Sequence, residues 1–193
     1  MKTKDNLRKH IFQKRKSLLE KERLDAEKSL FQLWNSIKEL YKINKVALYW
    51  SINGEISTRS LISYFLEEGS ECFLPVISED KENKTLEFAL LEEENSLNSN
   101  RFGIPEPSKS KVIDLQQLDL IFLPCVCFDS SGNRIGMGGG FYDETLSQLS
   151  EKKETQLIML AYDFQEVDNC LPEAHDIKAD ACLTPNQYFK FKN

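Results

Sequence analysis

Glycine is sparse in this chain except in one short segment, whose composition could bind an anion. Five of the eight glycines fall within positions 132–140, and they are Gly132, Gly136, Gly138, Gly139 and Gly140. Glycine lets backbone N–H groups approach an anion closely, and the guanidinium of Arg134, which stands among these glycines, can bind two phosphate oxygens at once. The segment therefore predicts a phosphate-binding loop.

This segment differs from the two common nucleotide-binding glycine motifs. A Walker loop has a lysine directly after its last glycine, and no lysine follows here. A dinucleotide fingerprint that began at Gly136 would require a glycine at position 141, where Phe141 stands. A flexible turn or tight helix–strand packing is the alternative for such glycines, and for an isolated pair it would be favoured. Five glycines together with Arg134 favour a phosphate site of a different kind.

The surroundings of the glycine segment indicate how it is positioned. A continuous apolar run, Leu118–Leu123, ends at Pro124 and is typical of a buried central strand. A helix is expected to follow the glycines, from Phe141 to Leu149. In open α/β sheets, ligands bind at the carboxyl ends of the strands, and a helix N-terminus adds a favourable dipole for an anion. The loop is thus expected at a ligand-binding edge of a sheet.

The remaining elements follow from hydrophobic periodicity and turn residues. Amphipathic helices are expected at residues 4–19 and 21–41, and a third helix at 57–68, which ends at Gly69. Strands are expected at residues 45–50, 72–77, 86–91, 118–123, 156–162 and 181–184, and residues 92–111 are expected to form a long surface loop. Strands that alternate with helices predict one α/β domain over residues 1–193, a three-layer αβα fold with a mostly parallel sheet. The helices of residues 1–41 are expected to pack on this domain.

Charge and composition exclude several classes of protein. The net charge is −6, from 25 basic and 31 acidic residues, and residues 1–23 are basic whereas the rest of the chain is acidic. An acidic body argues against nucleic-acid binding. No apolar run is long enough to span a membrane, and the N-terminus lacks the apolar region of a signal peptide, so we expect a cytoplasmic protein. The five cysteines lie on apolar stretches and are expected to pack as free thiols.

Residues 133–143, Asn-Arg-Ile-Gly-Met-Gly-Gly-Gly-Phe-Tyr-Asp, resemble the signature of the 5-formyltetrahydrofolate cyclo-ligase family. That signature reads approximately G-x-R-L-G-x-G-x-G-Y-Y-D, and it follows a strand that ends in proline and then a Phe-Asp pair. Pro124 and the pair Phe128-Asp129 occupy those places. Ile135 replaces the leucine of the pattern, and Phe141 replaces its first tyrosine.

The resemblance extends over nearly the whole chain. Lys4 and Arg8 match a basic residue and an arginine four positions apart near the N-terminus of the family. The segment 54–58, Gly-Glu-Ile-Ser-Thr, matches a glutamate before a threonine after the first strand. Residues 102–107 resemble a G-I-P-x-P element, and residues 175–180 resemble an acidic stretch before the last strand.

The resemblance implies a fold like that of NagB, ribose-5-phosphate isomerase and the CoA transferases. It also implies a cytoplasmic ligase of folate one-carbon metabolism, which cyclises 5-formyltetrahydrofolate to 5,10-methenyltetrahydrofolate with ATP as co-substrate and Mg²⁺ as cofactor. The expected partners are these small molecules, without nucleic acid or membrane, and a monomer is expected.

The resemblance also implies a role for each matching residue. The catalytic residue is Arg134. The ATP-binding residues are Lys4, Arg8, Arg134, Gly136, Met137, Gly138, Gly139, Gly140, Phe141 and Tyr142. The folate-binding residues are Trp50, Glu55, Met137, Gly138, Gly139, Gly140 and Phe141. The Mg²⁺ ligands are Asp143 and Asp180.

Each of these residues also has a purely structural interpretation. Lys4 and Arg8 lie on one helix face, which is often simply solvated. Glu55 could be a surface carboxylate that precedes a helix, and Trp50 and Phe141 could belong to the core. Asp143 could stabilise a helix N-terminus and Asp180 could end a strand. His175 is not expected to be catalytic, because no nucleophile pairs with it in the sequence.

Two other functions stay open on the sequence. One is a different ATP-dependent ligase or phosphotransferase, which would turn over ATP without formylated folate. The other is a folate- or nucleotide-binding regulator, which would bind a ligand without turning over ATP. Arg134 together with Asp143 favours an enzyme over a regulator, because a binding protein has less need of a metal carboxylate.

Overall fold

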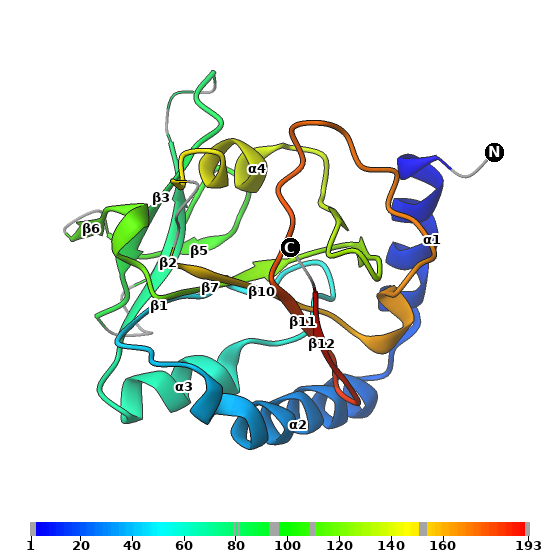
Figure 1. Ribbon diagram of the computed structural model, residues 1–193, viewed down its shortest axis with the longest axis horizontal. Coiled ribbons are helices and arrows are strands. Elements are labelled where there is room, and N and C mark those ends of the chain that lie inside the picture. The colour runs from blue at the N-terminus through cyan, green and yellow to red at the C-terminus, as the bar shows by residue number, and fades with distance from the viewer. Residues whose placement is uncertain are drawn as a thin grey trace.

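The protein is built around one mixed sheet with helices on both faces (Figure 1). The computed structural model describes residues 3–78, 80, 82–92, 97–108, 111–150 and 154–191. The helices are α1 (Lys4–Ser17), α2 (Glu20–Ile37), α3 (Arg59–Glu67) and α4 (Phe141–Leu146), with 3₁₀ turns η1 (Lys38–Leu40), η3 (Leu115–Gln117) and η4 (Asp163–Gln165). The main sheet contains β1 (Lys45–Ala47), β2 (Glu71–Ile77), β3 (Leu86–Leu90), β6 (Val112–Ile113), β7 (Leu120–Pro124), β10 (Gln156–Leu160), β11 (Ala181–Leu183) and β12 (Tyr188–Lys190). Two small hairpins add β4 (Asn98–Ser99) with β5 (Pro105–Glu106), and β8 (Cys127–Phe128) with β9 (Arg134–Ile135).

The order in which successive strands are added to the sheet reverses at β1. The order is β12-β11-β10-β7-β1-β2-β3-β6, and the strands from β11 to β2 are parallel, whereas the pairings at both edges are antiparallel. The chain moves from β1 to β2 on one side, and later returns to β7 on the other side. Ligands of open α/β sheets bind where the strand order reverses in this way, outside the carboxyl ends of the strands. The predicted mostly parallel sheet is confirmed.

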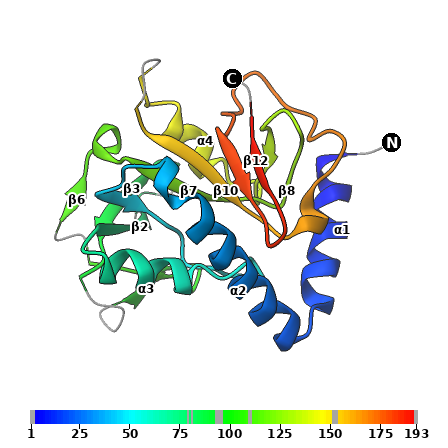
Figure 2. The same cartoon turned by 60° about the horizontal axis from the view of Figure 1, so that its bottom comes forward.

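The central strands bury both of their faces, which explains why they read as continuous apolar runs. Leu120 and Phe122 of β7 pack on the side of Trp34 in α2 and Phe65 in α3. Leu123 and the alternating residues of its face pack on the opposite side, which α4, η3 and the C-terminal segment cover. This alternation follows from the two-residue period of a strand. Figures 1 and 2 show α2 and α3 together below the sheet and α4 above it, so the three-layer fold is confirmed.

Helix α1 lies beside the sheet rather than in either covering layer (Figure 2). Ile11 is 1 % exposed and forms a small apolar cluster with Val126, Cys127, Ile135 and Cys170. This cluster attaches the N-terminal helix to the β8–β9 hairpin. The cluster therefore brings the first residues of the chain next to the glycine segment.

Several short elements differ from the sequence prediction. The helix expected over 141–149 ends at Leu146, and the segment expected as a loop over 92–111 contains the β4–β5 hairpin. Residues 93–96 and 109–110 of that segment lie outside the described residues. The β8–β9 hairpin and β12 were not predicted. The five cysteines are buried free thiols, as predicted. Within the part of the chain that the structure describes, no helix has the length and apolar character needed to cross a bilayer.

Candidate active site

A cavity of about 690 Å³ opens at the carboxyl ends of β1 and β7, where the strand order reverses. Tyr49 and Trp50 after β1 line it, together with Pro124 and Cys125 at the end of β7. The predicted site residues that line this cavity are Lys4, Arg8, Trp50, Glu55, Arg134, Gly136, Met137, Gly138, Gly139, Gly140, Phe141, Tyr142 and Asp143. The structure thus brings together segments that are far apart in the sequence.

The β8–β9 hairpin positions the glycine segment. Its turn is organised by the buried carboxylate of Asp129, whose Oδ1 accepts hydrogen bonds from the backbone N–H groups of Ser131 and Asn133 at 3.0 and 3.2 Å. Its Oδ2 accepts a bond from the N–H of Cys170 at 3.0 Å, which joins the hairpin to the later segment. Arg134 begins the returning strand of this hairpin.

Arg134 is a cation held rigidly at the cavity wall. Its side chain is 3 % exposed, and its Nη2 lies 2.7 Å from Oδ1 of Asp143. Its Nη1 donates to the carbonyl of Ile177, and the N–H of Ile177 donates back to the same Oδ1 of Asp143 at 3.2 Å. A charge that is fixed before substrate arrives needs no reorganisation during a reaction. This arrangement suits a preorganised electrostatic role.

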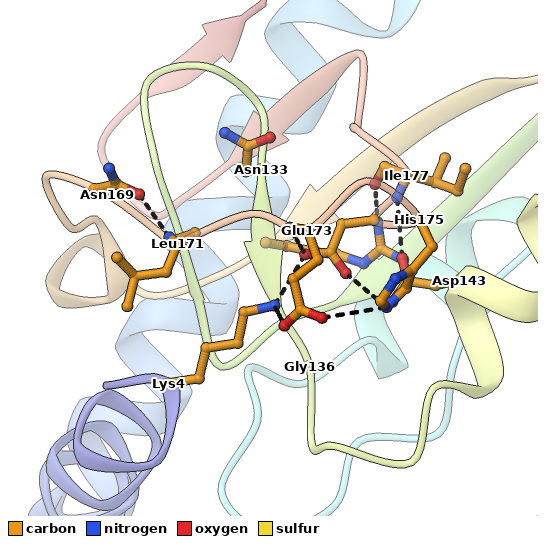
Figure 3. Close-up of polar contacts among 12 residues, drawn as sticks. Lys4, Asn133, Gly136, Asp143, Asn169, Leu171, Glu173, His175 and Ile177 are labelled. Carbon is orange, nitrogen blue, oxygen red and sulfur yellow. Dashed lines mark hydrogen bonds and ion pairs between the residues drawn. The ribbon is translucent and has the colours of Figure 1, made fainter. Parts of the chain in front are cut away.

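Helix α1 brings two further cations to the cavity. Nε of Arg8 donates to the carbonyl of Gly136 at 3.0 Å, and its guanidinium lies beside Gly138. Nζ of Lys4 lies 2.8 Å from Glu173 and 3.0 Å from Asp176, and Figure 3 shows it reaching from α1 toward Glu173. Both predicted basic residues therefore line the cavity, and Arg8 contacts the glycine segment.

The Lys4 ion pairs are reflected in the titration of their members. Burial alone would lower the pKa of Lys4, but its bonds to Glu173 and Asp176 outweigh burial and raise this pKa. The bond from Lys4 lowers the pKa of Glu173 in turn. The lysine is therefore charged at neutral pH, and it is held by two acidic side chains.

Glu55 stands on a tight turn at the wall of the cavity. The N–H of Glu55 donates to the carbonyl of Ile52 at 2.9 Å, and the carboxylate of Glu55 accepts a bond from the N–H of Ile52 at 3.1 Å. Asn53 and Gly54, between them, both have positive φ. Burial raises the pKa of Glu55 to about 7, although the N–H of Ile52 and the charge of Arg15 lower it. The carboxyl group can thus change its charge near neutral pH.

An apolar wall completes this side of the cavity. Pro75 and Ile77 of β2 line it, and the β4–β5 hairpin contributes Phe102 and Ile104. Glu106 fixes the hairpin, because its Oε1 accepts bonds from the N–H of Ile77 at 2.9 Å and from Nδ2 of Asn100 at 2.6 Å. Sequence reasoning did not assign these residues to the site. The G-I-P-x-P element was the one signal that pointed to this segment.

Aromatic and flexible side chains stand between the two sides. Tyr142 lines the cavity and also packs against the core, and burial raises the pKa of its hydroxyl. The ring of Phe141 lies against Gly139, and Met137 is 48 % exposed at the cavity mouth. Trp50 lines the cavity with the Arg59 guanidinium 4.5 Å from its ring centroid.

Asp180 lies away from the other predicted site residues. It directly precedes β11, so it lies at the amino end of a parallel strand, whereas the cavity lies at the carboxyl ends. Its Oδ2 accepts a bond from the N–H of Leu157 at 2.8 Å. Asp143 and Asp180 therefore do not form one metal site, and within the described ranges no three metal-binding side chains cluster.

The residues present still fit a magnesium ion that is held mainly by a nucleotide. Mg²⁺ in nucleotide sites commonly takes only one or two carboxylates, and phosphate oxygens and water fill its other positions. Asp143 lines the cavity, and the bonds recorded for its carboxylate engage Oδ1. One carboxylate beside a glycine loop is sufficient for that mode of binding.

Known proteins resemble this chain along its length. A sequence model of the 5-formyltetrahydrofolate cyclo-ligase family matches residues 1–185. The 5-formyltetrahydrofolate cyclo-ligase of Haemophilus influenzae is 36% identical over 174 residues, which cover 89% of this chain and 91% of the relative. The solution structure of 5,10-methenyltetrahydrofolate synthetase from Aquifex aeolicus has a TM-score of 0.83 and 30% identity, and the match covers 98% of this chain and 93% of that one.

A second solved structure supports the fold. The 5,10-methenyltetrahydrofolate synthetase of Mycoplasma pneumoniae aligns with a TM-score of 0.76 at 23% identity, over 95% of this chain and 99% of that one. The fold is thus shared with solved proteins over nearly the whole chain.

Proposed function

This chain belongs to the 5-formyltetrahydrofolate cyclo-ligase family, and from that premise we propose how its cavity couples ATP to the cyclisation of 5-formyltetrahydrofolate. The enzyme is a ligase of one-carbon metabolism that forms 5,10-methenyltetrahydrofolate. The observation that carries the proposal is the division of one cavity into a cationic side and a largely apolar side that carries the carboxyl group of Glu55.

The cationic side binds the triphosphate of ATP. Lys4, Arg8 and Arg134 converge there on the glycine segment 136–140. Three cations and several backbone N–H groups match the charge and the oxygen atoms of a polyphosphate. Phosphate binding would release Lys4 from Glu173 and Asp176.

The opposite side binds the folate. Trp50, Ile77 and Phe102 offer flat apolar surface for its rings, and Glu55 offers two carboxylate oxygens to the N–H groups of the pterin. Cavities with apolar walls and a few polar groups bind small organic ligands and orient them in this way. Met137 and Phe141 stand between the two ligands.

The chemistry needs positioning rather than a protein nucleophile. The formyl oxygen attacks the γ-phosphorus of ATP, the bond to the bridging oxygen breaks, and ADP leaves. Nitrogen N10 then attacks the formyl carbon and loses its proton, and phosphate leaves with the former formyl oxygen. Phosphoryl transfer of this kind depends on alignment and on neutralisation of charge.

The residues of the cationic side supply that neutralisation. Arg134 is preorganised by Asp143 and Ile177, so it meets the charge that develops on the transferred phosphoryl group. We propose that Asp143, and not Asp180, holds Mg²⁺, which when bound would neutralise charge on the phosphate oxygens. Lys4 and Arg8 orient the remaining phosphates.

The direct test is the formation of methenyltetrahydrofolate by the purified full chain, followed by absorbance. Product is expected only when 5-formyltetrahydrofolate, ATP and Mg²⁺ are all present, and chelation of Mg²⁺ is expected to stop it. ATP hydrolysis without folate would favour a different phosphotransferase. Ligand binding without any turnover would favour a regulator.

Arg134→Ala tests the role of the preorganised cation. We expect kcat to fall by about 100-fold or more, the size of effect seen when one such charge-stabilising group is removed. Arg134→Lys keeps a cation beside Asp143 and is the matched control, which is expected to retain more turnover. Circular dichroism would confirm that both variants fold. Near-normal cyclisation by a folded Arg134→Ala variant would refute the assignment.

A further inference from the structure

Arg15, near the end of α1, is a buried cation whose hydrogen bonds are incomplete. The residue is 1 % exposed, and its Nη2 donates to the carbonyl of Cys125, directly after β7. Its Nε and Nη1 are buried and have no hydrogen-bond partner among the described residues. A charge removed from water without full pairing is costly. A neutral side chain that donates one hydrogen bond to the carbonyl of Cys125 would be enough to attach α1 to β7, so the positive charge of Arg15 is not needed for that attachment.

Arg15 lies directly against the turn that carries Glu55. A Cβ added to Gly54 would come within 3.2 Å of the Cβ of Arg15, so the turn and the helix are in close backbone contact. Gly54 has φ +71, which lets the turn bend back against α1. The carbonyl of Arg15 accepts a bond from Nη2 of Arg23 at 2.8 Å, which fixes this end of α1. The position of the turn therefore depends on α1 at Arg15.

The titratable groups that face Glu55 from beside β1, β10 and α4 are neutral at physiological pH, and Nη1 of Arg23 in α2 lies 3.6 Å from where a Cβ of Gly54 would stand. Tyr49 after β1, Tyr142 of α4 and Tyr162 after β10 all have a pKa that burial raises. Burial raises the pKa of the Cys125 thiol to about 12. Within the described part of the chain, Arg15 is the cation whose charge lowers the pKa of Glu55.

We propose that Arg15 is a positioning residue for Glu55, which packs against Gly54, holds the Glu55 turn in place and supplies a buried positive charge at this turn when the folate covers it. The proposal rests on the proposed function of Glu55 as the folate-binding carboxylate. An ionised carboxylate accepts hydrogen bonds through both oxygens, whereas a protonated one is itself a donor. The substrate would exclude the remaining water from Glu55, so a nearby buried cation becomes more important in the complex than in the free enzyme.

The central test compares Arg15→Met with the wild type in steady-state kinetics. We expect KM for 5-formyltetrahydrofolate to rise by about 10-fold at neutral pH, a ratio typical of losing one charge-assisted interaction, whereas KM for ATP stays within about twofold. In the pH profile of kcat/KM for 5-formyltetrahydrofolate, the acidic limb is expected to move to higher pH by about one unit. The reason is that loss of a nearby opposite charge raises the pKa of a carboxyl group by about this amount. Arg15→Lys keeps the charge and is expected to restore the position of this limb.

Lys16→Gln is the matched control. It removes a cation one residue along the same end of α1, at an exposed position. We expect its pH profile to match the wild type. If Arg15→Met does not fold, Arg15→Gln replaces it, because the amide can still donate to Cys125.

Glu55→Gln separates the proposed role of Glu55 from the proposed role of Arg15. A normal folate KM in Glu55→Gln would refute the proposed role of Glu55 itself. A raised folate KM in Glu55→Gln, together with an unchanged folate KM and pH profile in a folded Arg15→Met variant, would overturn the role of Arg15 and leave it a structural residue. Equal rises of both KM values in Arg15→Met would also overturn it, because that outcome indicates general damage to the cavity.

Discussion

The carboxyl group of Glu55 lies in a place where its ionised form is poorly solvated. Burial raises its pKa from 4.5 to about 7, and the N–H of Ile52 and the charge of Arg15 offset only part of this effect. The folded protein therefore binds a proton at Glu55 that the unfolded chain releases between these two pH values. Stability is accordingly lost as the pH rises through this window. The residue that we propose to bind folate thus lowers the stability of the free enzyme.

Glu55→Gln is expected to stabilise the folded protein at alkaline pH. The amide keeps an oxygen for the N–H of Ile52 and removes the buried charge, so the gain should be absent below about pH 4.5 and reach up to about 3 kcal/mol above pH 7. Denaturant unfolding at several pH values would measure it. Glu67→Gln, at an exposed position of α3, is the control and should show no such dependence. A constant difference at all pH values would contradict the argument.

At single residues, the sequence pointed to residues of the cavity where the signal was local. The glycine segment and Arg134 could be found because they are contiguous, and the structure places them on one cavity. Arg15 could not be found, because a basic residue on an amphipathic helix usually lies on the solvated face. Asp180 precedes a strand, whereas Glu55 follows one. Because β11 is parallel to β10, the carboxylate of Asp180 lies at the amino ends of the strands, away from the cavity.

The β8–β9 hairpin is the element on which the cationic side depends, because it carries Arg134 and leads into the glycine segment. Its turn contains Gly132 with φ +79, and a Cβ at this residue would lie 2.8 Å from the carbonyl of Ala179 and 3.0 Å from the ring of Phe191. The hairpin is therefore packed against the segment before β11 and against the C-terminal region. Neither neighbour is near it in the sequence.

Gly132→Ala is expected to destabilise the protein by about 2 kcal/mol or more, from the left-handed φ and the backbone clash together. Gly69→Ala is an informative control, because Gly69 has the same φ of +79 with nothing within 4 Å of the added Cβ. Its cost should be only about 1 kcal/mol, from the φ alone. Chemical denaturation would measure both variants. Equal losses would show that the packing against Ala179 and Phe191 contributes nothing.

Long elements were predictable and very short ones were not, for a physical reason. Helices α1 and α2 span several turns and show their apolar stripe, and β7 and β10 are buried on both faces, so each has a clear pattern. The two-residue strands β4, β5, β8 and β9 are too short for any period, and side-chain bonds such as those of Glu106 and Asp129 stabilise them. The shortened α4 also leaves less helix dipole at the glycine segment than a nine-residue helix would give.

At the scale of the whole molecule, the cavity joins the two halves of the chain. Residues 4–55 supply Lys4, Arg8 and Glu55, and residues 134–143 supply the glycine segment with its flanking charges. The cluster around Ile11 holds α1 against the hairpin without any ligand. Phosphates bound between α1 and the glycine segment would add a second connection. Ligand binding should therefore stabilise the fold as a whole rather than one loop.

If ATP phosphates connect α1 to the glycine segment, Lys4 should affect the thermal shift caused by ATP and not the shift caused by 5-formyltetrahydrofolate. ATP with Mg²⁺ at 100 times its dissociation constant should add about 2.7 kcal/mol, which for a protein of this size raises Tm by about 5–10 °C. Lys4→Gln should lose much of this shift at the same ATP concentration and keep the shift caused by 5-formyltetrahydrofolate. Lys9→Gln makes the same charge change at an exposed site on α1 and should keep both shifts. The ion pairs of Lys4 lie on the cationic side of the cavity. Loss of the folate shift in Lys4→Gln would therefore mean that the two sides of the cavity are not separate binding regions. Retention of the full ATP shift would mean that α1 does not bind the phosphates.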